Sequence, residues 1–158
     1  DKEEANADEA DSDEEEAAEA EADEAEAELE AAIEVENDLR SEIVTYALQF
    51  VGNRYKYGGT NPNTGVDCSG FTSYVMRHAA EVELPHSSGG QSRMGRQVSS
   101  SEMRPGDIIC YGSGKRINHV ALYIGNGQIV HASTERTGIK VSRWNYRTPV
   151  RIVNVLGD

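Results

Sequence analysis

The sequence predicts an α+β fold, with helices first and an antiparallel β-sheet after them. Two segments before residue 84 repeat apolar residues at helical spacing, and turn residues divide the chain beyond residue 105 into short apolar runs. Helices that precede the strands, rather than alternating with them, are typical of α+β domains. With 158 residues and 37% hydrophobic content, the chain is long enough for one compact domain and an appendage.

The first 36 residues form an acidic segment. They contain 19 of the 28 acidic residues and one basic residue, Lys2, whereas residues 37–158 contain 9 acidic and 14 basic residues. Like-charge blocks with few apolar residues are typically solvated, so residues 1–36 are predicted to be a linker or tail, part of which could be helical. Weak calcium binding or a protein contact is the alternative. The mildly basic remainder is compatible with an anionic partner.

Two helices are expected in residues 37–158. The first starts near Asn37 and stops before Gly52. Its apolar side consists of Leu39, Ile43, Tyr46, Ala47 and Phe50. After a loop rich in turn residues, Asp67 is placed to cap a second helix that starts at Cys68 and runs to about Glu83. Its apolar stripe consists of Cys68, Phe71, Val75, Ala79 and Val82.

Strands are expected at residues 108–111, 119–124, 128–133, 139–142 and 150–155. Residues 112–115 are expected to be a loop, and residues 125–127 to close a hairpin as a three-residue loop. In that register His119 and His131 lie on one face as diagonal neighbours, whereas a two-residue loop would put them on opposite faces. The other face is apolar and belongs in the core, with Val120, Leu122, Ile124, Val130 and Ala132.

Cys68 has the predicted surroundings of a nucleophile. At the first position of its helix, the sulfur would meet backbone N–H groups and the positive end of the helix dipole, which lower a thiol pKa below its usual value of about 8.5. The same N–H groups could hold the oxyanion of an acyl transfer reaction. The alternative is a small residue in a core, which is the reading for Cys110 in its apolar strand. Both cysteines are expected to be free thiols.

His119 and His131 could supply the base and its orienting partner that a cysteine nucleophile needs. His78, on the exposed side of its helix, and His86 are expected to be surface or loop residues. A zinc site made of Cys68 and the histidine pair is an alternative, but the sequence has no short CxxC or HxxxH pair and no fourth ligand. We therefore expect no metal.

Five segments of the chain contain recognisable sequence motifs: RYKYGGTNPNTGVDCSGFTSYV, LPHSSGGQ, MRPGDIICY, INHVALYIGNGQIVHAS and the closing strand. In this order they resemble the NlpC-like family of bacterial cell-wall cysteine peptidases, a circularly rearranged, papain-like group. The resemblance covers residues 38–156 and none of the acidic segment. It implies that residues 37–158 are a papain-like domain, with N-terminal helices packed on a central antiparallel sheet and the nucleophile at a helix N-terminus.

The resemblance also implies roles for individual residues. Cys68 would be the nucleophile, His119 the general base, and His131 the third residue that orients His119. The positions that would contact substrate are Tyr55, Asp67 and Ser69. One departure concerns His86, because many members of the family have arginine at this position after Leu-Pro.

The activity that the resemblance implies is that of a thiol protease, a hydrolase that cuts peptidoglycan stem peptides between D-isoglutamate and the diamino acid without a cofactor. An N-acetylmuramoyl-L-alanine amidase, an acyltransferase or a non-catalytic wall-binding module are the alternatives. The partner would be peptidoglycan or its stem peptides, with no nucleic acid and no membrane span, and the protein a monomer. Because peptidoglycan lies outside the cytoplasmic membrane, we expect an exported protein, extracellular or in the cell wall. The chain starts at Asp1 without a secretory signal, which suggests a processed product or a part of a longer protein.

Overall fold

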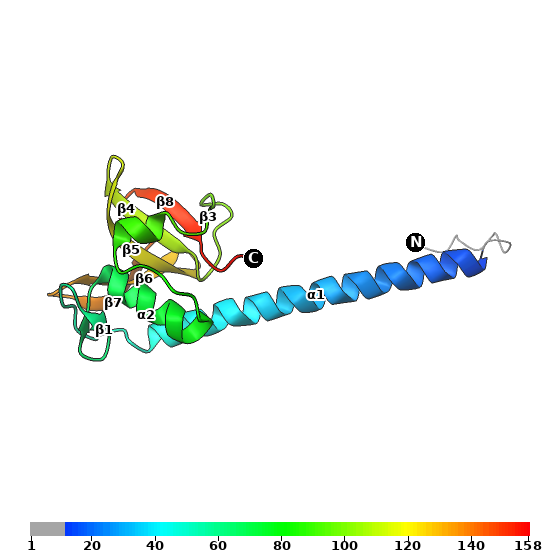
Figure 1. Cartoon of the computed structure of the whole chain (residues 1–158), viewed down its shortest axis with the longest axis horizontal. Coiled ribbons are helices and arrows are strands. Elements are labelled where there is room, and N and C mark those ends of the chain that lie inside the picture. The colour runs from blue at the N-terminus through cyan, green and yellow to red at the C-terminus, as the bar shows by residue number, and fades with distance from the viewer. Residues whose placement is uncertain (1–11) are drawn as a thin grey trace. The chain divides into compact units, whose positions relative to one another are not determined.

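The computed structural model describes residues 12–158, with side chains from residue 20 onward. The chain divides into two compact units, Asp1–Asn37 and Asp38–Asp158. Helix α1 (Ser12–Leu48) runs through both (Figure 1), so the predicted helix start near Asn37 is wrong. The physical reason is that residues 12–48 contain no glycine or proline and are rich in alanine and glutamate, which have high helix propensity.

In the first unit, the side chains of residues 20–35 are all exposed. Residues 1–11 lie outside the described part of the chain. The role of residues 1–36 as a linker or tail stays a prediction. None of the helices in the described part of the chain is both long and apolar enough to cross a membrane.

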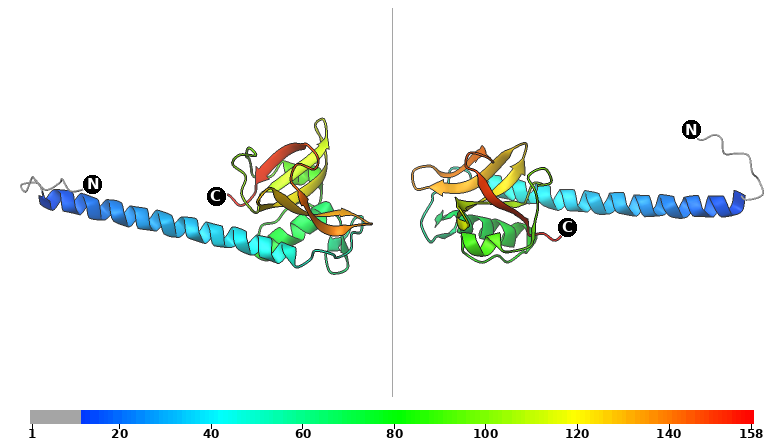
Figure 2. Two further views of the ribbon diagram at one scale, coloured as in Figure 1. Left: turned by 180° about the vertical axis from the view of Figure 1, so that it is seen from behind. Right: turned by 90° about the horizontal axis from the view of Figure 1, so that it is seen from above.

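In the second unit, the last turns of α1 and helix α2 (Cys68–Ala80) share one core with the sheet (Figure 2). Ile43 and Ala47 of α1 and Phe71 and Val75 of α2 are fully buried in the same apolar cluster. The cluster also contains the apolar face of the central strands, so the helices bury one face of the sheet.

Helix α2 ends at Ala80, three residues before the predicted end at Glu83. Glu81 adopts the left-handed conformation, with φ of 57°, and its N–H donates to the carbonyl of Arg77 at 3.1 Å. The next residue, Val82, still packs against the core, as the apolar residue after a helix cap often does. The apolar stripe therefore continues past the end of the helix. This is why the sequence pattern predicted a helix that is too long.

The main sheet is antiparallel, with the strand order β3-β8-β4-β5-β6-β7. Its strands are β3 (Arg96–Gln97), β4 (Ile108–Ser113), β5 (Arg116–Gly125), β6 (Gln128–Thr134), β7 (Gly138–Arg143) and β8 (Pro149–Asn154). Two short strands, β1 (Thr60–Asn61) and β2 (Gly65–Val66), pair separately, and α3 (Ser88–Ser92) is a short helix; none of these three was predicted. The five predicted strands are confirmed as β4 to β8, but β4 extends into the predicted loop at residues 112–115, and β5 starts at Arg116, before its predicted start at His119.

The β5–β6 hairpin has the predicted register. Tyr123 lies opposite Ile129, so the residue numbers on the two strands add as a three-residue loop requires. Gly125 also pairs with Gln128, and this bulge leaves only residues 126 and 127 in the turn, both with positive φ. The bulge restores the register that a plain two-residue turn would have shifted by one. The apolar face is buried as predicted, with Val120, Leu122, Val130 and Ala132 in the main core.

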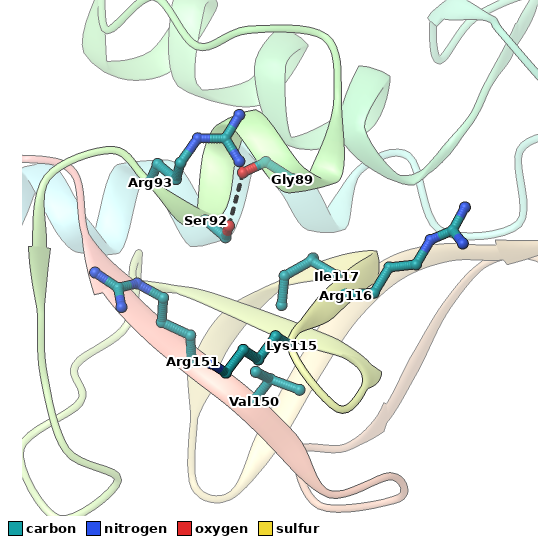
Figure 3. Close-up of a pocket in the computed structure, with 8 residues that line it drawn as sticks. All are labelled: Gly89, Ser92, Arg93, Lys115, Arg116, Ile117, Val150 and Arg151. Carbon is teal, nitrogen blue, oxygen red and sulfur yellow. Dashed lines mark hydrogen bonds between the residues drawn. The ribbon is translucent and has the colours of Figure 1, made fainter.

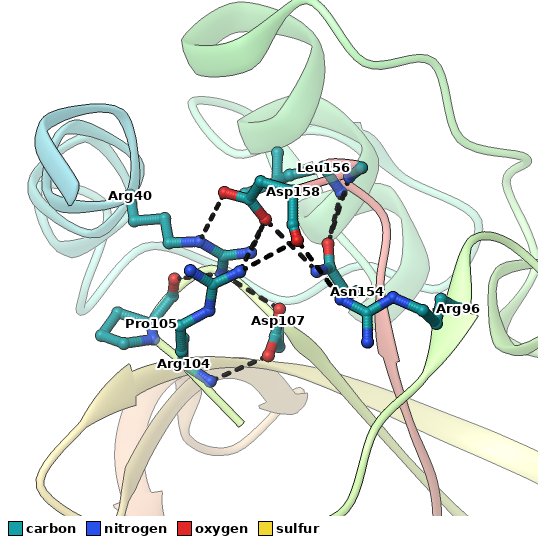
Figure 4. Close-up of polar contacts among 9 residues, drawn as sticks. Arg40, Arg96, Arg104, Pro105, Asp107, Asn154, Leu156 and Asp158 are labelled. Carbon is teal, nitrogen blue, oxygen red and sulfur yellow. Dashed lines mark hydrogen bonds and ion pairs between the residues drawn. The ribbon is translucent and has the colours of Figure 1, made fainter. Parts of the chain in front are cut away.

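A buried ion pair fixes α1 to the start of β4. The Arg40 guanidinium donates through Nη1 to Asp107 Oδ1 at 3.0 Å and to the Pro105 carbonyl at 2.8 Å (Figure 4). Through Nε it also donates to Asp158 Oδ2 at 3.2 Å. The Arg40 and Asp107 side chains are only 3% and 1% exposed, so both charges of this ion pair are shielded from water.

Candidate active site

Asp67 organises the start of α2. Its Oδ1 accepts the N–H of Gly70 at 2.8 Å, which confirms the predicted N-cap, and its Oδ2 accepts the N–H of Gly58 at 3.0 Å. The backbone N–H of Asp67 donates to the carbonyl of Gly59 at 3.3 Å. One carboxylate thus joins the helix start to the preceding loop and fixes the position of the next residue, Cys68.

Cys68 is half-buried at a cavity of about 380 Å³. The backbone N–H groups of Val120, Ser69 and Cys68 itself act on the sulfur and lower its pKa. The contribution of Val120 means that the sulfur lies against β5, at the residue that follows His119. The prediction that Cys68 faces the sheet is therefore confirmed, as is the burial of Cys110, and both cysteines are free thiols.

The pKa of the Cys68 thiol is raised, not lowered as the sequence predicted. Burial is the largest cause, and the charge of Asp67 adds to it. The N–H groups at the helix start act in the predicted direction, but removal of the sulfur from water outweighs them. The sequence prediction considered only the helix dipole and left out the burial of the thiol.

The two predicted histidines meet inside the domain. Nε2 of His119 lies 2.8 Å from Nδ1 of His131, and the ring centroids are 5.0 Å apart. On its other side, His131 has Nε2 at 2.9 Å from Ser142 Oγ. Burial is the main cause that lowers the pKa of His119 to about 4 and that of His131 to about 3, so both rings are neutral at neutral pH.

Comparison with known proteins adds family membership to this geometry. Residues 52–152 match the model of the NlpC/P60 family. The chain belongs to the NlpC/P60 family. The solved NlpC/p60 domain of the peptidoglycan hydrolase SagA is similar to it, with a TM-score of 0.67, 32% identity, and coverage of 73% of this chain and 97% of that one. The predicted papain-like α+β fold is confirmed.

Curated NlpC/P60 relatives have names that refer to peptidase activity. The murein DD-endopeptidase MepS/murein LD-carboxypeptidase of Escherichia coli (strain K12) is 41% identical over 108 residues, which are 68% of this chain and 56% of the relative. The probable endopeptidase p60 of Listeria seeligeri is 42% identical over 98 residues, covering 62% of this chain and 18% of the relative. The chain thus spans about half of the first relative and a smaller part of the second.

Four of the positions that the sequence singled out, Tyr55, Asp67, Cys68 and Ser69, line one cavity, whereas His119 and His131 are not among its lining residues. Its lining consists of Tyr55, Tyr57, Gly58, Asp67, Cys68, Ser69, His86, Ser87, Ser88 and Asn118. Tyr55 is close enough for the Cys68 charge to raise its pKa, although burial is the larger cause. His86 is exposed, as predicted, yet it lines the cavity and its Nε2 lies 2.9 Å from Asp67 Oδ1. Its departure from the family pattern therefore falls among the residues that line this cavity.

The zinc alternative lacks its ligands. Within the described residues, no group of three or more histidine, cysteine, aspartate or glutamate side chains is spaced to hold a metal ion. The histidine pair bonds to Ser142 instead of to a further metal ligand.

Four residues near the site were not predicted. Ser142 belongs to β7, and Asn118 comes just before His119. Arg147, in the loop after β7, donates to Asn118 Oδ1 at 3.0 Å, and its charge helps to lower the pKa of His119. The Tyr146 ring lies 5.3 Å from the ring of His131. Residues 144–148 carry no motif, so no signal in the sequence pointed to this loop.

Proposed function

We propose that this protein is a cell-wall hydrolase that cleaves peptidoglycan stem peptides by cysteine catalysis. One observation carries the proposal: the Cys68 thiol, at a helix start and an open cavity, lies against the N–H of Val120, the residue after His119, and His119 forms a buried pair with His131 whose nitrogens are 2.8 Å apart. The name of the MepS relative includes murein endopeptidase and carboxypeptidase activity, and that of the p60 relative includes endopeptidase activity; both support the same class of reaction. We also propose that the protein is exported, because this substrate lies outside the cytoplasmic membrane.

The hydrogen bonds favour one assignment of protons. Nε2 of His119 is engaged with His131, so Nδ1 is the ring nitrogen left to exchange a proton with the thiol. A neutral His119 with a lone pair on Nδ1 carries its proton on Nε2 and donates it to Nδ1 of His131. His131 then carries its own proton on Nε2 and donates it to Ser142 Oγ. This chain of donors orients His119 as a base.

In the proposed reaction, the sulfur of Cys68 attacks the carbonyl carbon of the scissile amide while His119 takes the thiol proton. The N–H groups of residues 68 and 69 at the helix start stabilise the oxyanion of the tetrahedral intermediate. His119 passes the proton to the leaving amine as the C–N bond breaks. Water then attacks the thioester, one of its protons returns to the sulfur through His119, and the acid product leaves.

We place the cut between D-isoglutamate and the diamino acid. Tyr55, Asp67 and Ser69 line the cavity around Cys68 and are suited to hold the amino end of the substrate. An amidase that cuts before L-alanine, an acyltransferase on the same scaffold and a non-catalytic wall-binding module are the competing functions.

Digestion of purified muropeptides, followed by mass analysis, tests the proposal. We expect products with a new D-isoglutamate carboxyl end and a new amino end on the diamino acid, and no products from a Cys68→Ala variant. Cys110→Ala, which removes a buried thiol from a core strand, is the matched control and should retain activity. Cleavage by the Cys68→Ala variant would refute cysteine catalysis, and a new end on L-alanine would assign the amidase instead.

A further inference from the structure

A second hollow, of about 610 Å³, is larger than the cavity at Cys68. It lies between α3, the β4–β5 turn and β8. Its lining consists of Gly89, Ser92, Arg93, Lys115, Arg116, Ile117, Val150 and Arg151 (Figure 3). Four of these eight residues are cationic and none is acidic, and we call this feature the basic hollow.

The positive charge of the basic hollow is not neutralised by the protein. Among the side chains that the structure describes, no carboxylate forms an ion pair with any of the four cations. Arg151 donates through Nη1 to Gln97 Oε1 at 3.0 Å, but its buried Nε has no hydrogen-bond partner within the described residues. A buried donor without a partner is costly, and negative charge in the hollow would interact favourably with this guanidinium.

The arrangement of the cations favours an extended ligand over a small ion. In Figure 3 the charged groups of Arg93, Arg116 and Arg151 point in different directions around the hollow. One phosphate or acetate therefore cannot contact all of them at once. A chain that carries several negative groups at intervals can reach each in turn.

The basic hollow shares a wall with the Cys68 cavity. Ser88 and Asn118 line the cavity, whereas their chain neighbours Gly89 and Ile117 line the hollow. Ser88 Oγ donates to the Ile117 carbonyl at 3.5 Å across this wall. The two hollows are therefore neighbours, so a polymeric substrate that extends beyond the cavity over this wall would reach the basic hollow.

From this adjacency and from the charge of the hollow, we infer that the basic hollow is a second binding site, for carboxylate groups of the peptidoglycan whose stem peptide occupies the Cys68 cavity. The inference rests on the proposed function. Stem peptides are suitable ligands because D-isoglutamate, linked through its side chain, keeps a carboxylate, and each neighbouring stem adds more. A phosphate-bearing wall polymer has comparable charge, and the experiment below distinguishes it from the stem-peptide carboxylates.

Binding to insoluble peptidoglycan, measured by co-sedimentation in a Cys68→Ala background, tests the site without turnover. The test variant is Arg93→Ala with Arg116→Ala, and the control is Arg136→Ala with Arg143→Ala; all four side chains are exposed, and both pairs remove the same charge. We expect the test pair to weaken binding about fivefold, the size expected for two exposed charge contacts, and the control to change it less than twofold. Equal weakening by both pairs would overturn the inference.

Chemical treatment of the peptidoglycan separates the two sources of negative charge. Amidation of its carboxylates should abolish the difference between the two variant pairs, whereas removal of phosphate-bearing polymers should leave the difference unchanged. Loss of the difference after phosphate removal would overturn the assignment to carboxylates. When Cys68 is left intact, the proteins with either pair of substitutions should cleave a short soluble stem peptide at the wild-type rate. Failure of every variant and of the wild type to cleave it would refute the proposed function, while the binding result would still test the hollow.

Discussion

Replacement of Gly70 by alanine should damage the site more than the stability of the domain. A Cβ atom at Gly70 would lie 2.2 Å from the Gly59 carbonyl oxygen and 2.9 Å from Asp67 Oδ1. Since real Cβ contacts are essentially never shorter than 3.0 Å, the loop and the helix start would have to separate by about 0.8 Å. The displaced atoms belong to backbone and to the cap that positions Cys68, so no flexible side chain can absorb the change.

Two effects of different size follow. Overpacking of this kind typically costs about 1–3 kcal/mol, which corresponds to a fall in Tm of about 3–12 °C for a domain of this length. A displacement approaching 1 Å between a nucleophile and its base can reduce the rate on the order of 100-fold. We therefore expect a folded Gly70→Ala protein with little activity.

Thermal unfolding and initial cleavage rates on a soluble stem peptide measure the two effects. Gly89→Ala is the control, because a Cβ atom there would have its nearest neighbour, Arg93 Nη1, at 3.8 Å. The control should keep both its Tm and its rate. A Gly70→Ala protein that matches the control in both measurements would show that the close approach to Gly59 does not hold the thiol in place.

Two further outcomes concern charged side chains. Arg147→Gln removes a positive charge that lowers the pKa of His119, so that pKa should rise. Because His119 must be neutral to accept the thiol proton, the acid limb of the kcat/KM profile should move to higher pH, and an unmoved limb would contradict the role given to Arg147. Arg40→Met leaves a buried carboxylate without its partner and should lower the free energy of unfolding by about 3–5 kcal/mol, measured in urea; a loss below 1 kcal/mol would mean that water replaces the guanidinium.

The sequence predicted those parts of the site that depend on local rules. An N-cap acts within one helical turn, so Asp67 could be matched to the start of α2. Strand alternation and the residues of the turn were sufficient to put His119 and His131 on one face. The bulge at Gly125 was not foreseen, but it preserves the register on which the histidine pair depends.

The sequence could not predict contacts that only the packed domain creates. Arg147 reaches Asn118 from a loop 29 residues away, and no pattern within that loop shows the contact. Arg40 pairs with Asp107 across 67 residues of chain. The prediction of a lowered Cys68 pKa was wrong because burial in the folded domain raises this pKa, and the local sequence pattern does not show that burial.

Burial raises the pKa of the Cys68 thiol and lowers the pKa of His119, so both shifts disfavour charge. In the free protein the proton therefore stays on sulfur.

A pair of opposite charges on Cys68 and His119 is still easier to form than either charge alone, because opposite charges a few ångström apart attract strongly where water is excluded. The N–H of Val120 stabilises the thiolate, and the chain through His131 to Ser142 stabilises the imidazolium. A substrate that fills the cavity excludes more water and brings the carbonyl carbon that the thiolate attacks. In the proposed reaction, proton transfer and attack are therefore coupled, and the nucleophile is charged only while substrate is bound.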